Sequence, residues 1–220
     1  MRIPGIGLLA GLVCLALLGW PAVGMAGDLA PLEVAKRLQS QYETTKSMAA
    51  DFQQTTSMPG AGRKRFGSGR VVILKPGRIR WDYETPDVQV LITDGKKAHL
   101  YFAASAQMIV RPVAEYLNSD ITYSFFAGSG DIVRDFEVSP PERPDGAGLV
   151  AIKLTPKKPH PQVAMLHVWV DRDFVLQRLE IVDHFGSITD LVFSNIRKNQ
   201  PVSGDTFRFT PPAGTEIIEQ

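Results

Sequence analysis

Apolar and polar residues alternate along most of the chain, which is typical of β-strands that bury one face. The alternating stretches are separated by short turn signals such as KPG, ETPD and TDGK. Because short turns join strands that run in opposite directions, the pattern predicts an antiparallel sheet. About eleven strands are expected, at residues 47–53, 69–75, 78–83, 88–93, 97–102, 107–111, 149–155, 164–170, 175–183, 188–197 and 206–209.

Helical spacing is found in three segments. Residues 32–42 place apolar side chains at every third or fourth position, and Asp28 stands where it can cap an amphipathic helix. Residues 113–118 and 121–127 predict two shorter helices, the second rich in aromatic side chains. The alternation of strand and helix that a parallel sheet requires is missing.

Together these elements predict a mainly β (α+β) fold built on one curved antiparallel sheet. A sheet of about ten strands or more twists until it curls, splits or closes. The helices must then cover its concave face. An interior of this width need not be filled by side chains alone, so it has room for an apolar ligand.

The N-terminal residues 1–26 predict a cleavable signal peptide. Arg2 precedes an apolar run at 6–18, and small residues follow the run. The run is shorter than the ~20 residues that cross a bilayer, so a permanent anchor is the weaker alternative. We therefore expect residues 27–220 to form a single domain in the periplasm. Cys14 is the only cysteine, so the mature chain has no disulfide or thiol chemistry.

Charge is nearly balanced, with 24 Lys and Arg against 23 Asp and Glu. Loss of the signal peptide removes one basic residue and leaves 23 of each sign, so nucleic acid is not an expected partner. Arg63, Lys64 and Arg65 nevertheless form a local basic cluster at a predicted hairpin. This cluster either contacts anionic lipid head groups or an acidic partner surface, or it is a solvated loop.

The histidines offer little support for chemistry. None of them stands in a metal-ligand spacing, so we expect neither a metal nor another cofactor. His184, beside Asp183 and near Ser187, carries a minor hydrolase hypothesis. Neighbours in a strand point to opposite faces and do not form a relay easily, and Gly186 favours a turn there. We therefore expect no enzymatic activity.

Three stretches of the chain carry a family resemblance. GSGRVVILKPGRIRWDYETPDVQVLITDGK, DHFGSITDLVFSNIRKN and FRFTPPAGTEII, in this order and spacing, resemble the periplasmic outer-membrane lipoprotein carrier family, LolA. The likeness runs from Asp28 to Ile218. It implies an open antiparallel half-barrel with helices over the concave face. It also implies a monomer that carries lipoprotein acyl chains from an inner-membrane ABC transporter to an outer-membrane receptor, without bond chemistry.

The resemblance also gives Lys75 a role. The family's basic residue before the proline ties lid to barrel when the cavity is empty, and it is often arginine; here Lys75 stands in that position. Lysine lacks the planar forked donors of arginine, so we expect looser closure. Four residues further on, the family often has an aromatic residue facing the cavity, and Ile79 replaces it.

The residues expected to line the cavity follow from the alternation within each strand. Val71 and Ile73 share a face, as do Ile79 and Trp81, while Arg80 takes the opposite face. Each of these positions could equally belong to a filled core. A lipid-sensing or lipoprotein-sensing module, or a carrier of another lipid such as a glycolipid, remains an alternative with the same fold. The predicted lining set is Phe52, Val71, Ile73, Ile79, Trp81, Val90 and Ile92 from strands and Leu38, Phe125 and Phe126 from helices, with Ile152, Val168, Ile181 and Phe193 in the later strands.

Overall fold

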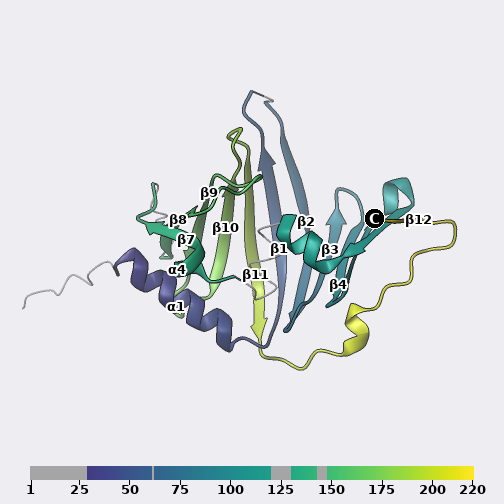
Figure 1. Cartoon of the computed structure of the whole chain (residues 1–220), viewed down its shortest axis with the longest axis horizontal. Helices are drawn as coiled ribbons and strands as arrows, with labels where there is room; N and C mark the ends of the chain where they lie inside the picture. Colours follow the sequence, from purple (N-terminus) through teal and green to yellow (C-terminus); the bar gives the residue numbers. More distant parts are fainter. Residues whose placement is uncertain (1–28, 61, 120–129, 143–147) are drawn as a thin grey trace, which may run out of the picture.

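The chain folds into one wide sheet, shown in Figure 1. The structure is a computed structural model that describes residues 29–60, 62–119, 130–142 and 148–220. The strands in these ranges are β1 (Ser47–Ser57), β2 (Lys64–Leu74), β3 (Arg78–Thr85), β4 (Gln89–Asp94), β5 (Lys97–Phe102), β6 (Gln107–Pro112), β7 (Phe136–Ser139), β8 (Val150–Pro156), β9 (Met165–Val170), β10 (Leu176–Val182), β11 (Ile188–Lys198) and β12 (Glu216–Glu219).

The sheet is curved and open. Its strand order is β12-β6-β5-β4-β3-β2-β1-β11-β10-β9-β8-β7, so β12 and β7 are its two edges and do not pair with each other. Neighbouring strands are antiparallel throughout, except that β12 runs parallel to β6. The prediction of a mainly β, curved half-barrel is therefore confirmed.

Three α-helices of the described residues lie over one face of the sheet: α1 (Pro31–Thr44), α2 (Val113–Ser119) and α4 (Ile132–Asp135), as Figure 1 shows. In α1 the residues Val34, Ala35 and Leu38 are buried, whereas Leu32 is exposed. Pro31 opens this helix, where its missing N–H costs nothing. No described helix is long and apolar enough to cross a membrane.

Several sequence predictions fall on residues that the structure does not describe or places differently. The signal peptide, the Asp28 cap and the helix at 121–127 lie outside the described residues. The strand predicted at 206–209 is wrong, because a 3-10 turn occupies Gly204–Phe207. Its apolar residues alternate because Phe207 and Phe209 pack against the sheet. The strands β7 and β12 and the helix α4 were not predicted, since four residues are too few to show a period.

Apolar side chains are buried on both faces of the sheet. The concave face carries the larger cluster, which includes Leu38 of α1 and Trp81 of β3. On the convex face, the segment that follows β11 crosses the sheet and buries Phe207 in a second cluster. That second cluster contains Val72, Val90, Ile92, Tyr101, Met108, Val110 and Phe207.

Two predicted cavity residues belong to this convex cluster. Trp81 pairs directly with Leu91, so Leu91 and not its neighbours faces the concave side. The prediction for Ile92 is wrong, and the side chain of Val90 also packs in the convex cluster, although this residue borders the cleft described below. The alternation of apolar and polar residues could not show which side chains of β4 face the cavity, because β4 is apolar on both faces.

Gly69 marks a place where two backbones approach closely. A Cβ atom added there would lie 1.9 Å from the carbonyl oxygen of Asp82, whereas one at Gly67 would meet nothing closer than 3.4 Å. We expect Gly69→Ala to lower the free energy of unfolding by about 1–3 kcal/mol or more, because strands β2 and β3 must separate. Gly67→Ala is the matched control and should change it by less than about 1 kcal/mol in urea unfolding. Equal effects of the two substitutions would contradict this account.

Candidate functional site

Aromatic rings form the floor of the concave face. The Phe52 ring centroid lies 5.0 Å from that of Trp81 and 4.9 Å from that of Tyr83, and the Phe193 ring centroid lies 6.3 Å from that of Trp81. The Tyr83 hydroxyl donates a hydrogen bond of 2.7 Å to the side-chain carbonyl of Gln54. The rings come from β1, β3 and β11, and they share one face because the register of these strands brings them together around Phe52.

An open cleft of about 770 Å³ lies over part of this floor. One wall is formed by β3, β4, β5 and α2, and the other by residues 161–163 and the ends of β10 and β11. This size is within the range of ordinary ligand sites. Its apolar lining includes Trp81, Tyr83, Leu91, Leu100, Phe102, Tyr116, Val163, Ile181 and Leu191, and polar side chains at its edge include Gln54, Gln89 and Thr189.

The predicted lining residues divide between the cleft and the packed core. Trp81, Val90 and Ile181 border the cleft, and Ile92 packs in the convex cluster. Phe125 and Phe126 lie outside the described residues. The others pack in the concave cluster without bordering the cleft: Phe52, Val71, Ile73, Ile79, Leu38, Ile152, Val168 and Phe193.

Sequence reasoning missed several residues of the cleft. Leu91 and Leu100 face each other on β4 and β5, and Tyr116 reaches the cleft from α2. The short connection at residues 86–88 is the signal that could have placed Leu91, because it limits how β3 and β4 can pair. Counting on from Trp81 through this connection then puts Leu91 on the concave side.

The basic cluster lies at the tip of the hairpin between β1 and β2. Arg63, Lys64 and Arg65 are all exposed. Arg65 borders the cleft, whereas Lys64 alternates to the other face of the hairpin. The prediction that these residues contact a partner or lipid head groups stays a prediction at this point.

Beneath α1 the side chains of the concave face are closely packed. A small void of about 50 Å³ lies there. Side-chain contacts hold the helix at several points: the Arg37 guanidinium lies 5.0 Å from the Phe174 ring centroid, and the Lys198 ammonium donates to the Gln41 side chain at 3.0 Å. This half of the concave face is therefore a filled core.

Lys75 contacts the last turn of α1. Its ammonium donates to the main-chain carbonyl of Tyr42 and lies 3.4 Å from the centroid of the Tyr42 ring. A cation is favoured here because the C-terminal carbonyls of a helix carry partial negative charge. Burial lowers the pKa of Lys75, and the nearby charge of Glu43 opposes that shift by raising it.

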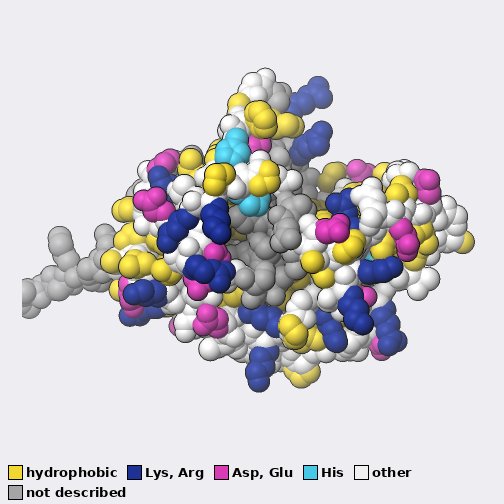
Figure 2. All heavy atoms as spheres, viewed as in Figure 1, with side chains coloured by type: hydrophobic (Ala, Val, Ile, Leu, Met, Phe, Trp, Pro, Cys, Tyr) yellow, Lys and Arg dark blue, Asp and Glu magenta, His cyan; other side chains and the backbone are white. Residues whose placement is uncertain are grey.

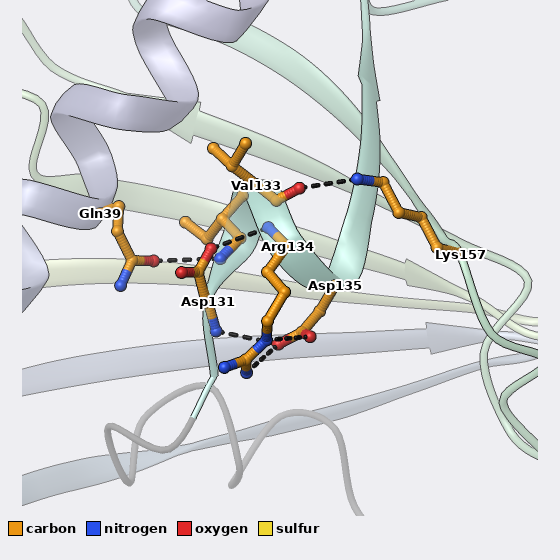
Figure 3. Close-up of polar contacts among 7 residues, drawn as sticks. Gln39, Asp131, Val133, Arg134, Asp135 and Lys157 are labelled. Carbon is orange, nitrogen blue, oxygen red and sulfur yellow. Dashed lines mark hydrogen bonds and ion pairs between the residues drawn. The ribbon is translucent and has the colours of Figure 1, made fainter.

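The short helix α4 is tied to its neighbours by polar contacts, drawn in Figure 3. Asp131 caps it by accepting a hydrogen bond of 2.8 Å from the backbone N–H of Arg134. The N–H of Ile132 donates to the Gln39 side chain of α1 at 3.1 Å. From the other side, the Lys157 ammonium donates to the carbonyl of Val133 at 2.8 Å. The helix α4 therefore joins α1 to the end of β8.

The residues of the hydrolase hypothesis, Asp183, His184 and Ser187, form the turn between β10 and β11. The Asp183 carboxylate accepts the backbone N–H groups of Phe185 and Ser187, both at 2.8 Å. Burial acts to raise the pKa of Asp183, but hydrogen bonds from Ser187 and Phe185 bring it below its ordinary value. The His184 Nε2 atom lies 2.7 Å from the carbonyl oxygen of His160. Among the described residues, no group of three or more His, Cys, Asp or Glu could hold a metal ion.

Known proteins resemble this chain over most of its length. The sequence profile described as "Outer membrane lipoprotein carrier protein LolA" matches residues 43–210. The chain belongs to the LolA family. A LolA-family relative from Methylobacillus flagellatus, named outer-membrane lipoprotein carrier protein, is 30% identical over 181 residues, which cover 82% of this chain and 86% of the relative. A relative of the same name from Cupriavidus necator is 32% identical over 204 residues, 90% of this chain and 95% of the relative.

A solved structure shares the fold of this chain. An uncharacterized conserved protein from Thermus thermophilus superposes with a TM-score of 0.55 at 12% identity, over 86% of this chain and 98% of that one. At this identity the likeness concerns the fold alone. The expectation of LolA membership, drawn from three short stretches of sequence, is confirmed.

The carboxylate of Asp135 gives a pH-dependent test of the α4 contacts. A hydrogen bond from Arg134 lowers its pKa; burial opposes this, and the N–H of Asp131 lowers it further. Because the pKa of Asp135 is lower in the folded than in the unfolded chain, its ionised carboxylate stabilises the folded state at pH values above the ordinary aspartate pKa of about 3.8. This contribution is lost as the pH falls through the lowered pKa.

We therefore expect Asp135→Asn to be less stable than the wild type near neutral pH. The difference should shrink below about pH 4, where the unfolded wild-type chain binds its proton first. Urea unfolding of both proteins across this pH range measures it. A difference that is constant with pH would show that the carboxylate charge does not hold α4.

Proposed function

We propose that this protein is a periplasmic carrier that takes the acyl chains of lipoproteins into the concave cleft. It would receive them from an inner-membrane ABC transporter and deliver them to an outer-membrane receptor. The observation that supports this most is the open cleft of about 770 Å³ floored by Trp81, Leu91 and Leu100. The names of the relatives, and membership of the LolA family, support the same class of cargo.

The physical need for such a cleft follows from the cargo. Each methylene group moved out of water contributes about 0.8 kcal/mol, so an acyl chain does not cross an aqueous compartment unprotected. Rings and leucines on the floor offer the apolar surface that the chain requires. Polar groups at the edge, such as Gln54 and Gln89, are suited to the ester and amide groups at the head of the lipid.

The same proposal gives Lys75 the role of a latch between the sheet and α1. Its two contacts with Tyr42 are both non-covalent and partly exposed to solvent. Contacts of this kind contribute about 1–2 kcal/mol together. A closing energy of this size holds α1 on the sheet in the empty protein and lets it open at small cost, so the proposed latch concerns the filled half of the concave face beside the cleft.

Leu91 and Ile92 provide a matched pair for the acyl site. They are adjacent in sequence, both buried, and face opposite sides of β4. We expect Leu91→Gln to weaken binding of a fluorescent fatty acid at least roughly five-fold, because an amide would be buried against the acyl chain. Ile92→Gln should lose similar stability and keep the affinity. Titrations of both variants measure this, and equal loss of affinity would remove the cleft as the acyl site.

Cargo identity has its own direct test. The wild-type protein and Leu91→Gln are purified from the periplasm, and bound molecules are identified by mass spectrometry. Lipoproteins bound to the wild type and reduced in the variant are the expected result. A glycolipid or a free lipid in their place would support the alternative carrier, and an empty wild-type protein together with failed acyl titrations would contradict both.

The latch is tested by removing the charge of Lys75 while keeping its stem. We expect Lys75→Met to raise hydrogen exchange in the last turn of α1 roughly 5–30-fold, the equivalent of about 1–2 kcal/mol. Lys97→Met, which removes an exposed lysine paired with Glu219 at the far side of the sheet, is the control. Unchanged exchange in Lys75→Met would mean that packing alone holds α1.

A further inference from the structure

The hairpin between β1 and β2 projects beyond the neighbouring strands, as the top of Figure 1 shows. The turn between β10 and β11 lies against it, since a Cβ atom added to Gly186 would be 3.3 Å from the Pro59 ring. We call residues 57–60, 62–66 and 183–187 the tip. Its large apolar side chains are unusually open to solvent: Phe185 is 88% exposed, Phe66 65% and Met58 42%.

The tip is also basic. Between Asp51 and Asp82 the sequence contains no acidic residue, while Arg63, Lys64 and Arg65 follow one another at the hairpin. Asp183 is the one acidic residue of the tip, and its carboxylate is turned to the backbone N–H groups of Phe185 and Ser187. Figure 2 shows hydrophobic and basic side chains together at the top of the molecule.

The tip adjoins the mouth of the cleft. Met58, Arg65, Phe66 and Phe185 all border the cleft as well as the solvent. A ligand that leaves the cleft on this side therefore passes the exposed apolar residues first. This continuity connects the tip with the acyl site and sets it apart from an ordinary solvated hairpin.

Two kinds of surface could attract such a tip: an acidic protein or an anionic membrane. A stable protein interface buries about 800 Å² on each partner, and a narrow projecting hairpin offers a small contact area. A membrane surface suits it better, because aromatic side chains favour the region of the lipid head groups and each nearby Lys or Arg is attracted by anionic lipid.

We propose that the tip seats the protein on anionic phospholipid, with Phe66, Phe185 and Met58 at the boundary between head groups and acyl chains and the basic residues on the phosphates. The mouth of the cleft then faces the bilayer, so an acyl chain enters or leaves along an apolar path. The use of this contact rests on the proposed carrier function. The contact itself requires no cargo and is measured on the empty protein.

The test is flotation with vesicles of equal parts phosphatidylglycerol and phosphatidylcholine, compared with pure phosphatidylcholine. The wild type should bind the anionic vesicles and lose binding as salt rises. Replacing Arg63, Lys64 and Arg65 together by Gln should weaken this roughly 100-fold, at roughly five-fold per charge. Phe66→Ser with Phe185→Ser should weaken it at least roughly ten-fold.

The control removes as many charges elsewhere, by replacing the exposed Lys36, Lys96 and Arg172 with Gln. It should bind vesicles like the wild type. The proposal is overturned if tip and control variants bind equally, or if neutral vesicles bind as well as anionic ones. It is also overturned if the wild type ignores vesicles while an acidic protein partner binds in a manner that depends on the tip.

Acyl binding separates this proposal from the proposed function. Arg63 and Lys64 belong to the tip but do not border the cleft, so replacing these two alone by Gln should leave binding of the fluorescent fatty acid unchanged and weaken vesicle binding roughly 25-fold. Leu91→Gln should bind vesicles like the wild type. Failure of vesicle binding alone contradicts only the membrane contact. Failure of fatty-acid binding by the wild type contradicts the carrier function and leaves the membrane contact to stand on the vesicle result.

Discussion

The architecture depends on a broad apolar concave face that is packed over one half of the sheet and left hollow over the other. Over β8 to β11 this face is covered by α1, whose residues Val34, Ala35 and Leu38 are buried, and a void of about 50 Å³ lies beneath the end of the helix. Over β3 to β5 it bounds a cleft of about 770 Å³ instead. One half of the curved sheet therefore carries the packed core, and the other half carries the open cleft.

A hollow beside the core forgoes contacts that a filled interior would gain, so stability must come from elsewhere. The convex face provides it. There the C-terminal segment places Phe207 against Ile92 and Tyr101, and the Arg80 guanidinium donates to the carbonyl of Thr206 at 3.0 Å. Because the C-terminal segment covers part of β3 to β5 on this side, their concave side can be left open without exposing both faces of the strands fully.

Sequence reasoning reached the fold and the family but only part of the site. The pairing of β2 with β3 was predictable because Arg80 and Asp82 mark the polar face beside Trp81. In β4 three consecutive apolar residues fill both faces, so the choice between Leu91 and Ile92 needed the register. Whether Val71 and Ile79 line a hollow or a packed core could not be predicted at all, since either interior favours the same residues. The aromatic pair at 125–126 lies outside the described residues.

Lys75 stands where the family resemblance leads us to expect arginine, and its contacts show how lysine fits there. Arginine is favoured where a carboxylate offers two parallel acceptors. At the end of α1 the acceptors are a single carbonyl and the face of the Tyr42 ring, and one compact ammonium group meets both. The expected penalty for replacing arginine is therefore small at this site. A contact of that strength can break and re-form at small cost, which is what the proposed latch between the sheet and α1 requires.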